Sequence, residues 1–170
     1  MILIHDLNIN DSKEIFTSLA PDTKIFSKEI DDIKSCMGCF NCWIKTPGNC
    51  VIKDSYTEMP GYILEDGTCI IITEIKYGCY TSYVKNVLDR LPSGLLLPFF
   101  KTIEGKIHHI PRHNVPLKFI VIGYGQDVTY HEKQTFKELI KRTMINLSVS
   151  DYKSYVIKNI HETKTILENL

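Results

Sequence analysis

The sequence lacks three features that would place it among nucleic-acid-binding, membrane or fibrous proteins. It has no excess of charge, because 20 Lys and Arg balance 20 Asp and Glu, so no overall field draws it to nucleic acid or an anionic membrane. No apolar run approaches the roughly 18 residues that span a bilayer. No internal repeat or low-complexity tract is present. We therefore expect a cytoplasmic protein whose partners are small molecules or protein surfaces, with no nucleic acid and no membrane among them.

The length of 170 residues favours one domain, residues 1–170, over two. Two stretches interrupt its regular pattern. A cysteine-rich insertion occupies residues 34–54, and a connection over residues 92–116 is far longer than usual between a helix and a strand. Residues 95–100 of this connection are apolar enough to need a cover, which predicts a lid or a subunit contact.

Apolar runs and amphipathic stripes alternate along the chain. The runs predict strands at residues 2–7, 24–30, 68–73, 117–123 and 152–157. Helices are predicted at residues 11–19, from a capping box at Ser55 and Glu58 to Asp66, and on the stripes over 84–91 and 136–147, with one more at the end. Alternating strands and helices favour right-handed crossovers. The predicted fold is an α/β three-layer sandwich with a five-stranded parallel sheet, in the doubly wound order 2-1-3-4-5.

Four of the six cysteines are closely spaced. Cys36, Cys39, Cys42 and Cys50 give the pattern C-x2-C-x2-C-x7-C, and in a reducing compartment such clusters more often bind metal or carry redox chemistry than form disulfides. The residues leave three alternatives open: a [4Fe-4S] cluster, a zinc site, or free thiols without metal. Cys69 lies in a predicted strand and is assigned to the core.

A ligand site is expected at the carboxyl ends of the strands, where open α/β sheets bind their ligands. Two loops there combine glycine with an aromatic residue, which favours a planar ligand. The candidate contacts from these loops are Thr73, Glu74, Ile75, Lys76, Tyr77 and Gly78 after the third strand, and Gly123, Tyr124 and Gly125 after the fourth. Cys79, which follows the first loop, is a candidate reactive thiol.

The cysteine segment also carries a family resemblance. Residues 33–54 resemble the cysteine segment of the flavodoxin-like NAD(P)H-dependent FMN reductases, and the branch they resemble most is that of the iron-sulfur flavoproteins. The likeness extends through residues 77–90 and 105–109. It implies FMN as cofactor, its ring held by residues 73–82 and 123–130, with NAD(P)H as reductant and a homodimer or homotetramer as the assembly.

The chain departs from that family after the first strand. The family usually has a Gly-Ser-Pro-Arg phosphate loop there, whereas this chain has Leu7-Asn-Ile-Asn-Asp-Ser12. Asn8, Asn10 and Ser12 are the remaining candidate phosphate contacts, and Asp11 adds a charge that opposes a phosphate unless it caps the helix. Three outcomes stay open: weak FMN binding, a different binding mode, or no FMN.

The leading hypothesis is an FMN-dependent oxidoreductase that passes electrons from NAD(P)H through flavin to an iron-sulfur cluster or an unidentified external acceptor, with no protein side chain as catalyst. The rival is a non-catalytic flavodoxin-like protein that uses the cysteine segment for zinc or partner binding. Trp43 is predicted either to stack on a flavin or to cap the cysteine loop. A basic cluster in the long connection is expected at a surface or an interface rather than on a metal; it comprises His108, His109, Arg112 and His113.

Overall fold

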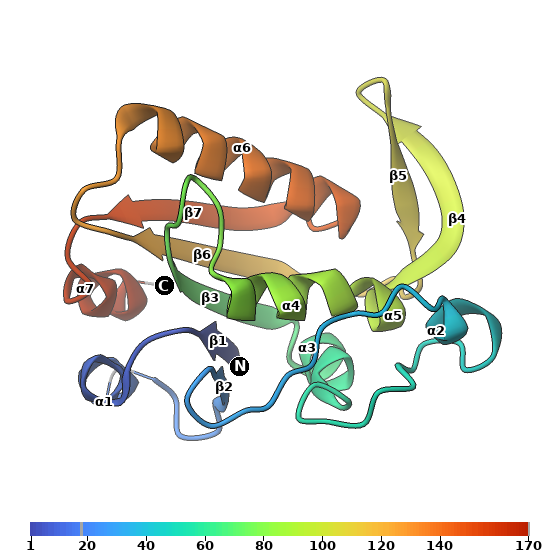
Figure 1. Cartoon of the computed structure of the whole chain (residues 1–170), viewed down its shortest axis with the longest axis horizontal. Coiled ribbons are helices and arrows are strands. Elements are labelled where there is room, and N and C mark those ends of the chain that lie inside the picture. Colours follow the sequence, from blue (N-terminus) through green and yellow to red (C-terminus); the bar gives the residue numbers. More distant parts are fainter. Residues whose placement is uncertain (18, 170) are drawn as a thin grey trace.

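The computed structural model describes residues 1–17 and 19–169 (Figure 1). A five-stranded parallel sheet forms its centre in the order β2-β1-β3-β6-β7. Its strands are β1 (Ile2–His5), β2 (Lys24–Ser27), β3 (Thr68–Glu74), β6 (Lys118–Tyr124) and β7 (Asp151–Ile157). Counting only these five, the order is the 2-1-3-4-5 arrangement predicted from the sequence, which is confirmed.

Helices cover both faces of the sheet, as Figure 1 shows. One face packs against α3 (Met59–Asp66), α4 (Ser82–Arg90) and α6 (Tyr130–Asn146). The other packs against α1 (Ile9–Phe16) and α7 (Glu162–Glu168). The middle strand β3 has a continuous apolar run from Cys69 to Ile72 because both of its faces are buried. The predicted three layers are therefore present, and no helix in the described part of the chain is long and apolar enough to cross a membrane.

Two predicted strand ends and one predicted helix start were wrong. The first strand ends at His5 rather than at residue 7. The second strand ends at Ser27 rather than at residue 30, because the backbone N–H groups of Ile30 and Asp31 turn back to the Ser27 carbonyl. The first helix begins at Ile9 instead of residue 11, because Asn8 is its N-cap residue. Its predicted range includes residue 18, which lies outside the described residues, as does residue 170 of the predicted domain.

The capping box predicted at Ser55 and Glu58 was also wrong. Helix α3 begins at Met59, and its N-cap residue Glu58 makes no capping hydrogen bond through its side chain. Pro60 lies in the first turn, where its missing N–H costs no helical hydrogen bond. The proline therefore suits the start of this helix.

The long connection contains secondary structure that the sequence did not predict. After the short α5 (Pro92–Leu95), an antiparallel hairpin is formed by β4 (Leu96–Ile103) and β5 (Lys106–Pro111). It stands beside the sheet, next to the cysteine segment with its short α2 (Asn41–Ile44) (Figure 1). Hairpin and cysteine segment thus lie together at one end of the molecule.

Candidate functional site

Asp6 lies at the sheet edge where the carboxyl ends of β1, β3 and β6 meet. Its carboxylate accepts hydrogen bonds from the hydroxyls of Thr73 (2.7 Å) and Thr81 (2.5 Å). The backbone N–H of Glu74 and the hydroxyl of Tyr124 also donate to it, each at 3.1 Å. Burial raises the pKa of Asp6, and these hydrogen bonds oppose part of the rise. Four donors match the acceptor sites of an ionised carboxylate, so Asp6 links the ends of three strands.

The N-terminus of α1 is already capped by the chain itself. The side-chain oxygen of Asn8 accepts from the backbone N–H groups of Asn10 and Asp11, both at 3.0 Å. The Asn8 amide donates to the Asp11 carboxylate at 2.8 Å, and the Ser12 hydroxyl donates to the Ile9 carbonyl at 2.9 Å. The side chains of Asn8 and Ser12 and the backbone N–H of Asn10 are thus engaged within this first turn.

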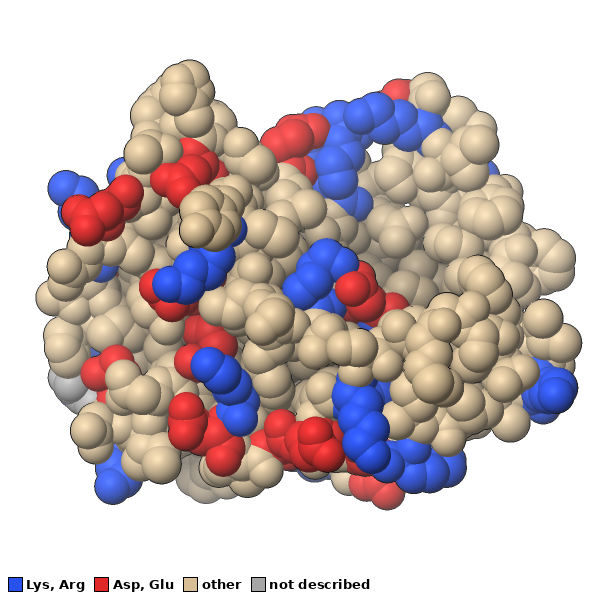
Figure 2. All heavy atoms as spheres, viewed as in Figure 1, with Lys and Arg blue, Asp and Glu red and all other residues tan. Residues whose placement is uncertain are grey.

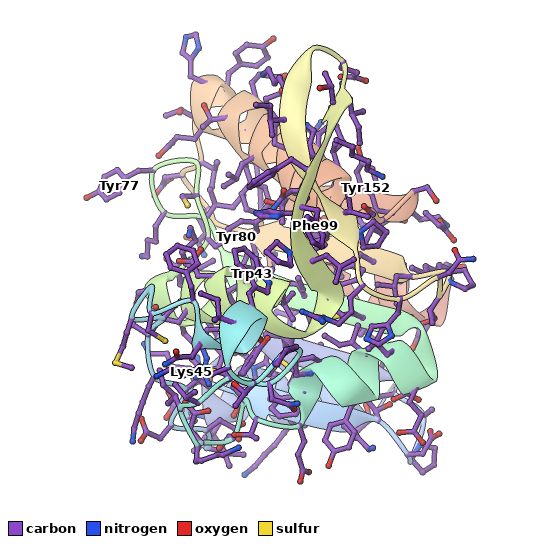
Figure 3. All side chains as sticks on the ribbon, turned by 90° about the vertical axis from the view of Figure 1, so that its right-hand side faces the viewer. Trp43, Lys45, Tyr77, Tyr80, Phe99 and Tyr152 are labelled. Carbon is purple, nitrogen blue, oxygen red and sulfur yellow. The ribbon has the colours of Figure 1, made fainter. Side chains whose placement is uncertain are left out.

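The loop after β3 forms a tight turn. The backbone groups of Lys76 and Cys79 bond to each other in both directions, at 2.9 and 2.8 Å. Tyr77 and Gly78 between them have φ values of 52° and 75°, the combination that type I′ turns use. Tyr77 is 94% exposed and points away from the body of the molecule (Figure 3). The Lys76 ammonium pairs with Glu74, whose hydrogen bond raises the pKa of Lys76.

The glycines of the two loops are explained by packing against α6. A Cβ on Gly78 would lie 2.9 Å from Thr135, and one on Gly123 would lie 2.4 Å from Phe136. Both distances are far below a normal contact between carbon atoms. These two glycines therefore let α6 approach the sheet, which is a sufficient reason for them without any ligand.

Two shallow cavities lie beside the predicted ring-binding loops. One of about 380 Å³ is bordered by Glu74, Ile75 and Gly125, and one of about 370 Å³ by Glu74, Tyr124 and Gly125. Thr73 is buried in the sheet instead. Of the predicted contacts, Lys76, Tyr77, Gly78 and Gly123 also do not line either cavity. The structure therefore gathers four of the nine predicted loop residues around open space.

A separate cavity of about 200 Å³ is lined by all four clustered cysteines. Cys36 and Cys39 are exposed, whereas Cys42 and Cys50 are half-buried. Burial raises the pKa of Cys42, and the neighbouring Cys50 and Cys36 raise it further. All four are free thiols, and among the side chains that the structure describes no three of His, Cys, Asp or Glu form a group that could hold a metal ion. The four cysteines thus line one cavity, and their predicted binding of a metal centre stays a prediction.

Arg90 of α4 holds both ends of the cysteine segment. It is only 1% exposed and donates to the Lys34 carbonyl at 3.0 Å, to the Ile52 carbonyl at 3.3 Å and to the Asp54 carboxylate. Asp54 in turn accepts from the Lys34 N–H at 2.9 Å. The guanidinium also lies 4.3 Å from the centre of the Tyr56 ring. These contacts fasten residues 34 and 52–54 to one helix, so the thiols between them sit on a closed loop.

Trp43 closes the cysteine segment against the hairpin. Its indole N–H donates to the Leu96 carbonyl at 3.1 Å, and its ring centre lies 4.8 Å from that of His109 and 5.7 Å from that of Phe40. Phe100 stacks on the same His109 at 4.6 Å. Figure 3 shows Trp43 directly beneath the hairpin. Of the two roles predicted for Trp43, this packing favours capping of the cysteine loop.

The remaining members of the basic cluster and the remaining cysteines have separate environments. His108 is buried, and Arg112 donates to the Leu96 carbonyl at 3.3 Å. Cys69 is fully buried in β3, as predicted, and burial raises the pKa of its thiol. Cys79 is half-buried in the tight turn.

Sequence reasoning missed two pairs of residues that organise these sites: Asp6 with Thr81, and Arg90 with Asp54. One signal for Arg90 was available, because it lies three positions after Val87 on the apolar stripe of α4 and must therefore meet the protein interior. A charge on such a stripe implies a buried partner. Asp6 offered a weaker signal, as the charge that ends the first apolar run.

The fold and the position of these cavities define a flavodoxin-like α/β protein, and comparison with solved structures agrees. The Trp repressor binding protein from Bacillus subtilis matches with a TM-score of 0.61 at 14% identity, over 99% of this chain and 97% of that one. An azoreductase from Bacillus anthracis str. Sterne matches with a TM-score of 0.61 at 7% identity, over 99% and 98%. An FMN-dependent NADH-azoreductase from Bacillus anthracis str. Ames Ancestor, in complex with FMN, matches with a TM-score of 0.51 at 14% identity, over 99% and 93%.

At these identities the similarity establishes the fold. No protein-family model and no curated protein matches the chain. The two ends of FMN fit this structure differently. The shallow cavities offer space beside the loops predicted to hold the ring. At the other end, the N-terminus of α1 is capped and the carboxylates of Asp6 and Asp11 would repel a phosphate. The phosphate end of FMN therefore does not fit the residues present.

Proposed function

We propose that this chain is a flavin-dependent oxidoreductase that takes electrons from NAD(P)H. The observation that carries the proposal is the pair of cavities bordered by Glu74, Tyr124 and Gly125, at the sheet edge where doubly wound folds bind their ligands. The similarity in fold to an FMN-dependent NADH-azoreductase supports it. Bound flavin supplies the redox chemistry in such enzymes, and the protein supplies binding and orientation.

The proposed ring contacts are the residues that border these cavities. Glu74, Ile75, Tyr124 and Gly125 face the open space, and their loops bring backbone groups to the same edge. Asn8, Asn10 and Ser12 remain proposed contacts. The side chains of Asn8 and Ser12 and the backbone N–H of Asn10 can contact a flavin only if the Asn8 cap opens, because they are engaged in the first turn of α1. No side chain is proposed as a catalyst, and the electron acceptor is an external molecule.

Flavin binding and NAD(P)H oxidation test the proposal directly. We expect purified protein to quench the fluorescence of added flavin and to oxidise NADH or NADPH only when flavin is present. Gly125→Val should weaken flavin binding by about tenfold or more, because Gly125 borders both cavities and a Cβ there would lie 2.6 Å from Val128, which must shift. Gly61→Val, at an exposed glycine of α3 that likewise lacks a positive φ and has open space around it, is the matched control. Absence of binding by any flavin would rule out the proposed activity.

The cysteine cavity supports a second candidate function, that of a redox or binding centre like the one in iron-sulfur flavoproteins. The specific observation is that Cys36, Cys39, Cys42 and Cys50 all line one cavity. Four thiolates are the ligand set of a [4Fe-4S] cluster. The alternatives are zinc or a protein partner at the same thiols, in which case the fold would serve as a non-catalytic scaffold.

Anaerobic reconstitution separates these alternatives. We expect near-stoichiometric iron and sulfide after incubation with both, and a spectroscopic signal of the reduced cluster. The double change Cys39→Ala and Cys42→Ala should abolish iron binding, whereas Cys79→Ala, a half-buried thiol outside the cavity, should retain it. Stoichiometric zinc with no iron would exclude the cluster and favour the scaffold. If the protein retained neither metal, the four cysteines would be free thiols and a metal centre would be excluded.

A homodimer or homotetramer is proposed as the assembly. Figure 2 shows a hollow between the hairpin and the cysteine segment, on a part of the surface that carries few charged side chains. Leu95 and Leu96 pack within their own chain, but Phe99 and Phe100 remain exposed. A second copy that covers the hairpin would remove these rings from water.

A further inference from the structure

Asp6 occupies the place where the fold would bring a ligand phosphate. Doubly wound sheets bind ligands at the switch point outside the carboxyl ends of the first and third strands, with phosphate at the adjoining helix N-terminus. In this chain that point holds the Asp6 carboxylate, and the hydroxyl donors around it are Thr73 of β3, Tyr124 of β6 and Thr81, the residue that precedes α4. The Asp6 carboxylate and its hydrogen-bond donors therefore already occupy this crevice.

The hydrogen bonds that cap the N-terminus of α1 block the same crevice from the side of this helix. The amides of Asn10 and Asp11, which would face a phosphate, donate to the Asn8 side chain. Asp11 itself places a carboxylate in the first turn. A phosphate entering there would meet two carboxylates and no free backbone donor among these two amides, so repulsion adds to the loss of hydrogen bonds.

We propose that Asp6 is a specificity-determining residue that excludes the phosphate, so that the site takes an unphosphorylated flavin of the riboflavin type rather than FMN. This inference rests on the proposed flavin function. The ring cavities beside Glu74 and Gly125 stay open, while the anion position is closed. The affinity of the protein for flavin then comes from the ring and the ribityl chain alone.

Fluorescence titration with riboflavin and with FMN tests this selectivity. We expect the unaltered protein to bind riboflavin at least as tightly as FMN. Asp6→Asn keeps the size of the side chain but removes its charge, and it should raise the affinity for FMN relative to riboflavin by about tenfold. Asp22→Asn, which removes an exposed carboxylate before β2, is the matched charge control and should leave the ratio unchanged. A preference for FMN of tenfold or more in the unaltered protein would overturn the inference.

Inorganic phosphate provides a second readout that does not depend on flavin. Two backbone N–H signals report on this position by NMR: that of Glu74, which donates to Asp6, and that of Thr81, which donates to the Thr73 hydroxyl beside it. Neither should move when phosphate is added to the unaltered protein, because the Asp6 carboxylate occupies the position. They should move with phosphate in Asp6→Asn. Movement in the unaltered protein, or none in the variant, would contradict the role of Asp6. Where Asp6→Asn does not fold, Asp6→Ser removes the same charge with a smaller side chain, and it should likewise raise the affinity for FMN relative to riboflavin.

The two proposals fail in different ways. Failure of the unaltered protein to bind either flavin would overturn the flavin function together with the riboflavin assignment, whatever phosphate does. Binding of flavin with a strong preference for FMN would support the flavin function and overturn only the inference about Asp6.

Discussion

His5 and Asp6 are adjacent residues at the end of β1 that lie in different environments. The His5 ring packs edge-on against Phe16, and its Nδ1 accepts the Leu7 N–H at 3.2 Å. Nε2 therefore carries the proton of the neutral ring, and it has no hydrogen-bond partner among the described residues. Burial lowers the pKa of His5 to about 4, although the charge of Asp31 opposes the shift. The native protein thus holds His5 uncharged at neutral pH.

This buried histidine predicts that the protein loses stability in mild acid. Because the pKa of His5 is about 4 in the folded chain and near 6.5 in the unfolded chain, the unfolded chain binds more protons between these values. The free energy of unfolding should therefore fall by about 3 kcal/mol as the pH drops from about 6.5 to about 4. Urea denaturation at several pH values measures this slope.

His5→Asn keeps an acceptor for the Leu7 N–H and should flatten that part of the pH dependence. His131→Asn changes an exposed histidine at the start of α6 and serves as the control that keeps the slope. An equally steep slope in both variants would show that His5 does not carry the effect.

Single residues were predictable from the sequence where their type and spacing decide their place. The four cysteines that line one cavity are an example, since their close spacing keeps them on one short segment of the chain. The role of Asp6 was not predictable in this way, because its hydroxyl donors Thr73, Thr81 and Tyr124 lie 67, 75 and 118 positions away along the chain. Only the folded sheet brings these groups to one edge.

At the scale of elements, the closest link between the cysteine segment and the rest of the fold is the contact of Arg90 with Asp54. The pair is buried, with side chains only 1% and 3% exposed. Burial is the largest influence and raises the pKa of Asp54, but the hydrogen bonds from Arg90, Lys34 and Tyr56 and the charge of Arg90 together outweigh it, so that the pKa of Asp54 is lowered. A buried pair of this kind is costly to break from one side, because the remaining charge has no partner.

Removing the guanidinium should therefore destabilise the protein and loosen the cysteine loop together. Arg90→Met is expected to cost about 3 to 5 kcal/mol of unfolding free energy and to speed the reaction of Cys42 and Cys50 with a thiol reagent. Lys85→Met on the same helix removes one partner of the exposed Lys85 and Asp89 pair. That control should change stability by less than about 1 kcal/mol. Equal losses in the two variants would contradict a specific role for Arg90.

The elements themselves were predicted with uneven success, for a physical reason. Strands such as β3 can be recognised in the sequence because burial on both faces requires a continuous apolar run. The hairpin of β4 and β5 was missed because its strand pattern is broken: the register shifts between Leu97 and Phe100, and Pro98 lies between them. A bulge of this kind removes the alternation by which a strand is recognised.

At the scale of the whole molecule, the sheet order followed from the alternation of strands and helices, since right-handed crossovers leave few arrangements. The position of the hairpin beside the cysteine segment did not follow, because it depends on contacts such as Trp43 with His109 between distant parts of the chain. That junction combines the cysteine cavity with exposed aromatic rings. It is the end of the molecule where we propose that a second subunit binds.

The exposed rings of the hairpin predict self-association through this end. Phe99, Phe100 and Ile107 are 60%, 61% and 72% exposed, and their transfer from water would favour an interface. We expect a dimer or tetramer in size-exclusion chromatography with light scattering. The combined change Phe99→Ser and Ile107→Ser should shift it to monomer without unfolding it. Ile30→Ser removes an isoleucine that is 82% exposed after β2 and should leave the assembly intact. A monomer at every accessible concentration, or an oligomer that tolerates both hairpin changes, would place the subunit contact elsewhere or remove it.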